Sequence, residues 1–256
     1  MGQRPEIVLV GAGVGDGFQL TVETQRALVW AGRAFTVGVS PAVLRYLRSL
    51  GVECVDLSSR LAERRPWVEA YAEIAGFILE QAKIDPPVVL LVPGNPLLSN
   101  AMSRYILVRA RELGLHVQVL AAVSPVDTFV CQAGLDVGTF GLQVFDARRL
   151  VARAVPLNPG VPLLLLQLAG LAALEAGSDG SGDAAAYGPL VDHLALFYPL
   201  DHSATHFSNS SDAAIAPVAS APLGRFAELV PQIGAASTLF IDLVRKPGAA
   251  GVAATR

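Results

Sequence analysis

The sequence has little cysteine, no excess of basic residues and no long hydrophobic run. Its 256 residues include two cysteines, Cys54 and Cys131, and neither belongs to a C-x-x-C pair. This argues against a disulfide framework, a zinc site and a redox motif, so a reducing compartment fits best. The formal net charge is −3, whereas nucleic-acid-binding proteins usually carry a basic excess. We therefore expect no metal and no nucleic-acid partner.

The longest apolar runs, such as 88–92 and 161–166, are too short to span a bilayer. The N-terminus also lacks the charged region followed by a long apolar run that marks a signal peptide. We expect a soluble, cytoplasmic protein with no membrane partner. Hydrophobic residues make up 52% of the chain, which is ample for a globular core.

In the first half of the chain, short apolar runs alternate with helical segments. The pattern predicts strands at 6–10, 33–38, 52–57, 87–96 and 116–124, and helices at 21–31, 40–51, 64–83 and 100–114. Thr21 and Ser40 are expected N-caps, and Gly32 and Gly51 lie just past two helix ends. Strands separated by helices predict a largely parallel sheet covered by helices.

The second half is less regular. It predicts strands at 162–170, 202–209 and 237–244, helices at 189–198 and 224–234, and a mobile loop at 175–188. The expected fold class is α/β, with two α/β subdomains at 1–122 and 123–246 and a ligand cleft between them. Residues 247–256 are expected to form a disordered tail.

The first strand runs into the glycine-rich turn "GAGVGDGF", with glycine at 11, 13, 15 and 17. The dinucleotide fingerprint G-x-G-x-x-G fails here, because Asp16 stands where the third glycine should be. The strand at 33–38 also ends without an acidic residue for a ribose, so an NAD-dependent dehydrogenase ranks last. On these residues alone, a ligand-binding turn and a turn that merely lets backbones pack closely are equally favoured.

Four motifs in order resemble the tetrapyrrole methylase superfamily, the class III S-adenosylmethionine-dependent methyltransferases. They are "IVLVGAGVGDGFQLT", "VVLLVPGNPLLSN", "VLAAVSPVDTF", and Gln167 in "LLLLQLAG". Within the superfamily the chain is similar to the borosin peptide backbone N-methyltransferases. "VEAYAEIAGFILEQ" resembles their helix with an active-site tyrosine, and the likeness runs from about residue 6 to 245.

The resemblance implies S-adenosylmethionine as the cofactor, S-adenosylhomocysteine as the product and a homodimer. It implies Tyr71 as the catalytic residue. The cofactor-binding residues that it implies are Gly11, Gly13, Pro93, Gly94, Asn95, Leu98, Ser124 and Gln167.

Each of these side chains also has an ordinary structural interpretation. Asn95 could hold its own turn, and Ser124 could be a helix N-cap with Pro125 at the first helical position. Gln167, inside an apolar strand, would be a buried amide in need of partners. Tyr71 could be a core aromatic, and His206 is left out of the catalytic set.

Three positions depart from the borosin pattern. Trp67 stands where those enzymes have arginine, Leu61 where they have tyrosine, and Asn95 where they have histidine. Arg64 or Arg65 could supply the missing cation. The chain ends about ten residues after its last expected strand, so we expect a separate peptide as the substrate.

The sequence thus predicts a methyltransferase for the backbone amides of a separate peptide. The alternatives are a small-molecule or tetrapyrrole-like acceptor, and a non-catalytic homologue that binds cofactor or peptide.

Overall fold

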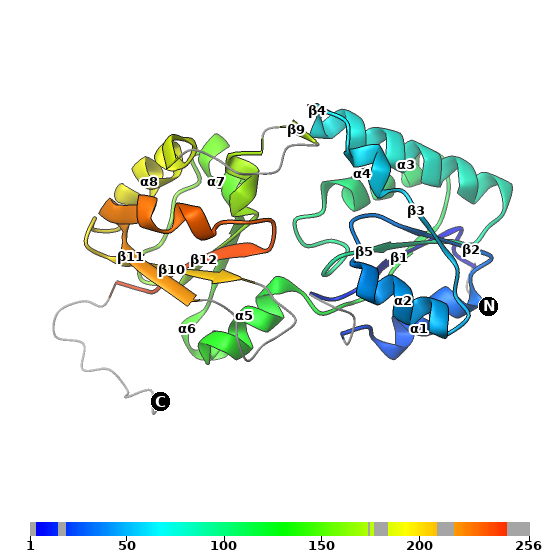
Figure 1. Ribbon diagram of the computed structural model, residues 1–256, viewed down its shortest axis with the longest axis horizontal. Helices are drawn as coiled ribbons and strands as arrows, with labels where there is room; N and C mark the ends of the chain where they lie inside the picture. The colour runs from blue at the N-terminus through cyan, green and yellow to red at the C-terminus, as the bar shows by residue number, and fades with distance from the viewer. Residues whose placement is uncertain (1–3, 15–18, 174, 177–183, 209–217, 245–256) are drawn as a thin grey trace.

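The computed structural model describes residues 4–14, 19–173, 175–176, 184–208 and 218–244. Gly15 and Gly17, half of the expected mobile loop (177–183) and the expected tail at 247–256 lie outside the described residues. Each half of the chain contains one five-stranded sheet (Figure 1).

The first sheet has the order β3-β2-β5-β1-β6, and all its paired strands are parallel. The strands are β1 (Ile7–Gly11), β2 (Arg33–Thr36), β3 (Cys54–Asp56), β5 (Val88–Val92) and β6 (Val117–Val119). Both central strands, β1 and β5, are fully buried, as expected for a sheet covered on both faces.

Helices cover both faces of this sheet. They are α1 (Val22–Trp30), α2 (Pro41–Ser49), α3 (Trp67–Ile84) and α4 (Ala101–Glu112), and the 3-10 turn η1 (Ser58–Leu61) precedes α3. Alternate strand residues pack on different helices: Leu9 joins the core under α3 and α4, and Val8 joins the core under α1 and α2 (Figure 1). The predicted parallel α/β arrangement is confirmed.

Helix α3 begins at Trp67, three residues later than predicted. The preceding Arg65–Pro66 forms a short strand, β4, that pairs with β9 (Glu175–Ala176) from the second half of the chain. Pro66 lies immediately before the helix, where its fixed φ suits an extended residue.

The second sheet is mixed, with the order β11-β10-β12-β8-β7. Its strands are β7 (Gln143–Asp146), β8 (Leu163–Leu166), β10 (Ser203–Ser208), β11 (Val218–Pro222) and β12 (Ser237–Ile241). One face packs on α7 (Ala147–Ala152), α8 (Gly188–Ala195) and η4 (Leu223–Glu228), and the other packs on α5 (Pro125–Ala133). The remaining elements are α6 (Val137–Phe140), η2 (Leu168–Leu171), η3 (Ala184–Tyr187) and η5 (Val230–Gln232).

The predicted helix at 224–234 is wrong: this segment forms the two 3-10 turns η4 and η5. Arg225 has non-helical dihedral angles, and Pro231 lacks the N–H that a continuous α-helix would need. Strands β7 and β11 and helix α7 have no counterpart among the sequence predictions.

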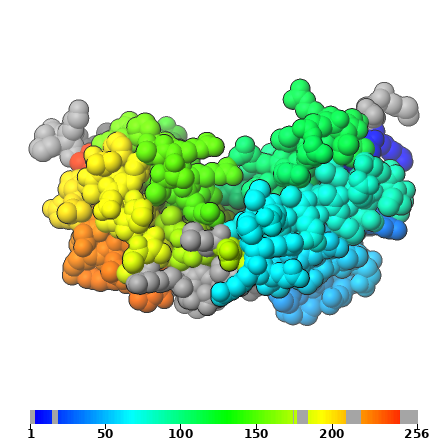
Figure 2. All heavy atoms as spheres, turned by 90° about the horizontal axis from the view of Figure 1, so that it is seen from above, coloured from blue at the N-terminus to red at the C-terminus, as the bar shows by residue number. Residues whose placement is uncertain are grey.

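The two halves meet along the carboxyl edge of the first sheet. Leu98, which follows β5, packs in one apolar cluster with Phe129 of α5 and Leu166 of β8. Figure 2 shows that the surface is hollowed between the two lobes. Among the described helices, none combines the length and the apolar character that a membrane span requires.

Candidate active site

The glycine-rich turn after β1 packs directly on the turn after β5. Gly13 and Gly94 form an isolated bridge, in which the Gly94 N–H donates to the Gly13 carbonyl over 2.8 Å. A Cβ placed on Gly11 would lie 2.0 Å from the Gly94 oxygen and 2.5 Å from the Ala122 Cβ. Close backbone packing therefore requires glycine at 11, and the φ of +76° favours it at 13.

Gly94 differs from these two glycines. Its φ is +64°, and a Cβ there would have only the Pro125 ring at 3.5 Å within contact distance. Pro93 stands beside Gly38, with 3.7 Å between the proline Cγ and a Cβ built on that glycine. The structure thus brings together Gly11, Gly13, Pro93 and Gly94 at the carboxyl edge, which is where open α/β sheets bind ligands.

Asn95 and Ser124 both use their side chains to hold backbone. The Asn95 amide donates to the Ala122 carbonyl over 3.3 Å and accepts from the Leu97 N–H over 3.0 Å. Ser124 caps α5 in a capping box with Asp127, whose carboxylate accepts from the Ser124 N–H and hydroxyl. The structural interpretations of both residues are therefore correct. A ligand at these turns would meet mainly backbone groups.

The expectation that Gln167 is a buried amide inside a strand is wrong. Strand β8 ends at Leu166, and Gln167 is exposed with a left-handed φ of +60°. Ser99, next to Leu98, is also left-handed, with a φ of +51°. Residues other than glycine adopt this conformation at a cost, and such residues cluster at functional sites. Ser99 lies in the loop between β5 and α4, and Gln167 follows β8, whereas the third such residue among those described, Ala154, follows α7.

Tyr71 lies in the second turn of α3, next to the same edge of the first sheet. Its ring stacks on Trp67, with 5.3 Å between ring centroids and 28° between ring planes. The Trp67 indole N–H donates to the Ala173 carbonyl of the second half over 3.0 Å. Leu61 and Tyr71 both pack against the core under α3. Trp67 thus packs on the tyrosine ring and ties α3 to the other half.

Burial raises the pKa of Tyr71 above its usual value, and the nearby Asp146 carboxylate raises it further, while the Arg148 guanidinium lowers it. Tyr71 is therefore a neutral hydrogen-bond donor near pH 7 rather than a ready base. Sequence reasoning missed Arg148 and Asp146, because an exposed arginine on a helix and an aspartate before a helix are ordinary features.

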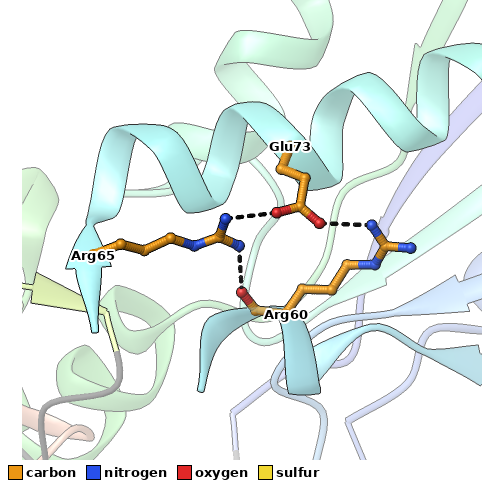
Figure 3. Close-up of polar contacts among 3 residues, drawn as sticks. All are labelled: Arg60, Arg65 and Glu73. Carbon is orange, nitrogen blue, oxygen red and sulfur yellow. Dashed lines mark hydrogen bonds and ion pairs between the residues drawn. The ribbon is translucent and has the colours of Figure 1, made fainter. Parts of the chain in front are cut away.

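Arg65 does not take the place of the missing cation. Figure 3 shows Arg60 and Arg65 on either side of Glu73, with nitrogen–oxygen distances of 2.7 and 2.6 Å. Arg65 also donates to the Arg60 carbonyl over 2.7 Å. The two arginines lower the pKa of Glu73 through these hydrogen bonds. This network holds the turn before α3, and Arg64 is exposed beside it.

Among the described residues, no group of three or more histidine, cysteine, aspartate or glutamate side chains could hold a metal ion. Two surface hollows of about 590 and 720 Å³ lie beside β6, one against α4 and the other against α1. Neither is lined by the site residues discussed above.

This fold and edge geometry belong to a known class of protein. The family model of the tetrapyrrole (corrin/porphyrin) methylases matches residues 6–172, which is more than half of the chain. The chain belongs to this family, and its place among the S-adenosylmethionine-dependent methyltransferases is confirmed.

The curated relatives are fused methyltransferases and peptide precursors. A type III borosin cyclic peptide precursor from Anomoporia bombycina is 26% identical over 88% of this chain, which covers 26% of that protein. The dendrothelin A precursor from Dendrothele bispora is 24% identical over 92% of this chain and 57% of its own length. The chain thus spans about a quarter to just over half of the length of these relatives, and the predicted resemblance to borosin methyltransferases is confirmed.

Solved structures agree on the fold. The uroporphyrin-III C-methyltransferase of Thermus thermophilus matches 93% of this chain and 94% of its own, with a TM-score of 0.65 and 18% identity. The same enzyme in complex with S-adenosylhomocysteine matches with a TM-score of 0.63 and 19% identity.

Proposed function

We propose that this protein transfers a methyl group from S-adenosylmethionine to a backbone amide nitrogen of a peptide. The observation that carries the proposal is the position of Tyr71. It lies near the carboxyl edge of the first sheet as a partly buried, neutral donor, within electrostatic range of charged groups of the second half. Family membership and the borosin relatives support the class of reaction.

The cofactor would lie on the turns after β1 and β5. A Cβ on Gly94 would meet only the Pro125 ring, so this glycine leaves room beside its backbone, whereas Gly11 and Gly13 let the two turns pack closely. Pro93 and Leu98 offer apolar surface. The N-terminus of α5 after Ser124 carries the partial positive charge that suits a carboxylate. Gln167 is exposed at the end of β8 and free to turn toward a ligand.

When bound, S-adenosylmethionine would supply a methyl group, whose carbon accepts the electron pair of the amide nitrogen as the carbon–sulfur bond breaks. The sulfonium would become a neutral thioether, and the amide proton would pass to water. The amide nitrogen is a poor nucleophile because its electron pair is shared with the carbonyl. The Tyr71 hydroxyl would donate to the carbonyl oxygen and hold the amide in line. A neutral tyrosine suits this role better than that of a base.

The peptide itself was predicted to be a separate chain. The relatives are methyltransferases joined to their own precursor peptides. Supplying peptide in trans therefore tests both the acceptor class and the separate-substrate prediction.

The experiment is to incubate the purified chain with S-adenosylmethionine and a pool of short, capped peptides of mixed sequence, and to sequence the products by tandem mass spectrometry. We expect fragment ions that place the added methyl on backbone nitrogen, and no product without the cofactor. Methyl groups on side chains only, or methylation of a tetrapyrrole but of no peptide, would contradict the proposal.

A further inference from the structure

The charged neighbours of Tyr71 come from the second half of the chain. Asp146 is the N-cap of α7, and Arg148 is the second residue of that helix. Tyr71 stands on α3 of the first half, so the two residues come from different halves and lie within electrostatic range of each other across the junction. Two polar groups that approach a junction from two lobes are an arrangement that a ligand between the lobes could bridge.

The backbone around Arg148 fixes where its side chain lies. A Cβ on Gly170 would stand 3.2 Å from the Arg148 Cδ, so the arginine stem rests on this glycine. Ala173, three residues further on, accepts the Trp67 indole N–H, and Trp67 stacks on Tyr71. Segment 170–173 therefore contacts both the Arg148 stem and the Trp67–Tyr71 pair.

The Arg148 guanidinium is available for a ligand. Arg148 is exposed, and within the described part of the chain it has no ion pair and no side-chain hydrogen bond. The Asp146 carboxylate is already engaged, because it accepts from the Arg149 N–H as the cap of α7.

The positive charge of Arg148 also lies in a part of the helix that disfavours cations. Cations are unfavourable in the first turn of a helix, where the backbone N–H groups give a partial positive charge. The first turn of α7 contains arginine and no acidic residue. Arg149 shares this position in the first turn, but Arg148 is the one that lies near Tyr71, which makes it the candidate for a functional role.

We propose that Arg148 is an acceptor-binding residue, whose guanidinium joins the Tyr71 hydroxyl in binding the carbonyl oxygen of the amide to be methylated. This inference rests on the proposed function, and it assigns half of the acceptor site to the second lobe. A planar guanidinium with several N–H donors suits a carbonyl oxygen and would orient the amide plane between the lobes.

The test compares Arg148→Ala and Arg148→Lys with the matched control Arg149→Ala, which removes the same charge from the neighbouring position of α7. Initial rates of S-adenosylhomocysteine formation are measured against the pooled capped peptides. We expect Arg148→Ala to raise KM for peptide by about tenfold to a hundredfold, as for the loss of a charged hydrogen bond. Arg148→Lys should recover part of the loss, Arg149→Ala should behave as wild type, and cofactor affinity should not change.

A second readout does not depend on turnover. Ultraviolet titration of tyrosinate, with Tyr71→Phe subtracted to isolate Tyr71, should show that Arg148→Ala moves the ionisation of Tyr71 to higher pH and that Arg149→Ala does not. If the wild type methylates peptides and Arg148→Ala matches Arg149→Ala in both readouts, this inference is overturned and the proposed function stands. If the wild type methylates no peptide, the proposed function fails, and the peptide-binding role of Arg148 fails with it.

Discussion

At the scale of single residues, Tyr71 is the side chain on which the proposed reaction depends most. Tyr71→Phe keeps the stack on Trp67 and removes only the hydroxyl donor. We expect kcat for peptide methylation to fall about a hundredfold, as for the loss of one donor to a reacting carbonyl, with cofactor affinity unchanged. Tyr105→Phe, an exposed tyrosine of α4, is the control. A Tyr71→Phe enzyme with wild-type kcat would contradict the role.

His206 links the stability of the second half to pH. It is buried in β10, with 2.7 Å between its Nε2 and the Ser237 hydroxyl, and burial lowers its pKa. The unfolded chain then binds a proton more readily than the folded one, so stability is lost as pH falls below about 6.5.

We therefore expect the free energy of unfolding to decline between about pH 7 and pH 5, with His206 contributing at most about 1.4 kcal/mol per pH unit. Denaturant titrations at several pH values measure this decline. His206→Gln should flatten it, and His116→Gln, at an exposed histidine, should leave the wild-type slope. An unchanged slope in His206→Gln would show that another group is responsible.

At the residue scale, the sequence predicted helix N-caps better than it predicted contacts between residues far apart in the chain. Thr21, Ser40 and Ser124 cap helices as predicted, because the cap is a local hydrogen bond to an N–H three residues away. The exposure of Gln167 depends on where β8 ends, and the approach of Arg148 to Tyr71 joins positions 77 apart in the chain. Local patterns do not encode either of these.

At the scale of elements, the packing of the β1 turn on the β5 turn gives a sharp test. Gly11→Ala would place a methyl group 2.0 Å from the Gly94 oxygen. Gly11 is held in β1, and Gly94 is held by its bridge to Gly13. We expect it to destabilise the protein by about 3 kcal/mol, the upper range for overpacking. Gly76→Ala in α3, where a Cβ meets nothing within 4 Å, should stabilise by about 0.5–1 kcal/mol. Thermal unfolding measures both, and equal effects would contradict the packing.

Periodicity predicted the first sheet well, because parallel strands buried on both faces appear as short apolar runs between capped helices. It failed where structure depends on partners. Strand β7 is a half-buried edge strand next to β8, and β4 is only two residues that pair with β9. The 224–234 segment has helical composition, but Gly224 packs against the Leu200 carbonyl and the segment folds as 3-10 turns.

At the scale of the whole molecule, the strands of the two sheets fall on either side of the predicted boundary near residue 122. That the halves are separate subdomains stays a prediction, as does the homodimer, which sedimentation equilibrium would measure. The contacts between the halves lie around one place in the molecule. Leu98 with Phe129, Trp67 with Ala173 and β4 with β9 all join the lobes around the proposed site.

The central claim is that the turns at the carboxyl edge of the first sheet bind S-adenosylmethionine. Calorimetry of the purified chain with S-adenosylmethionine and S-adenosylhomocysteine tests it most directly. We expect both to bind with Kd in the micromolar range, a free energy of about −8 kcal/mol. The absence of binding by either ligand would contradict the claim, and it would mean that the glycines at 11, 13 and 94 serve only to let two backbone turns pack together.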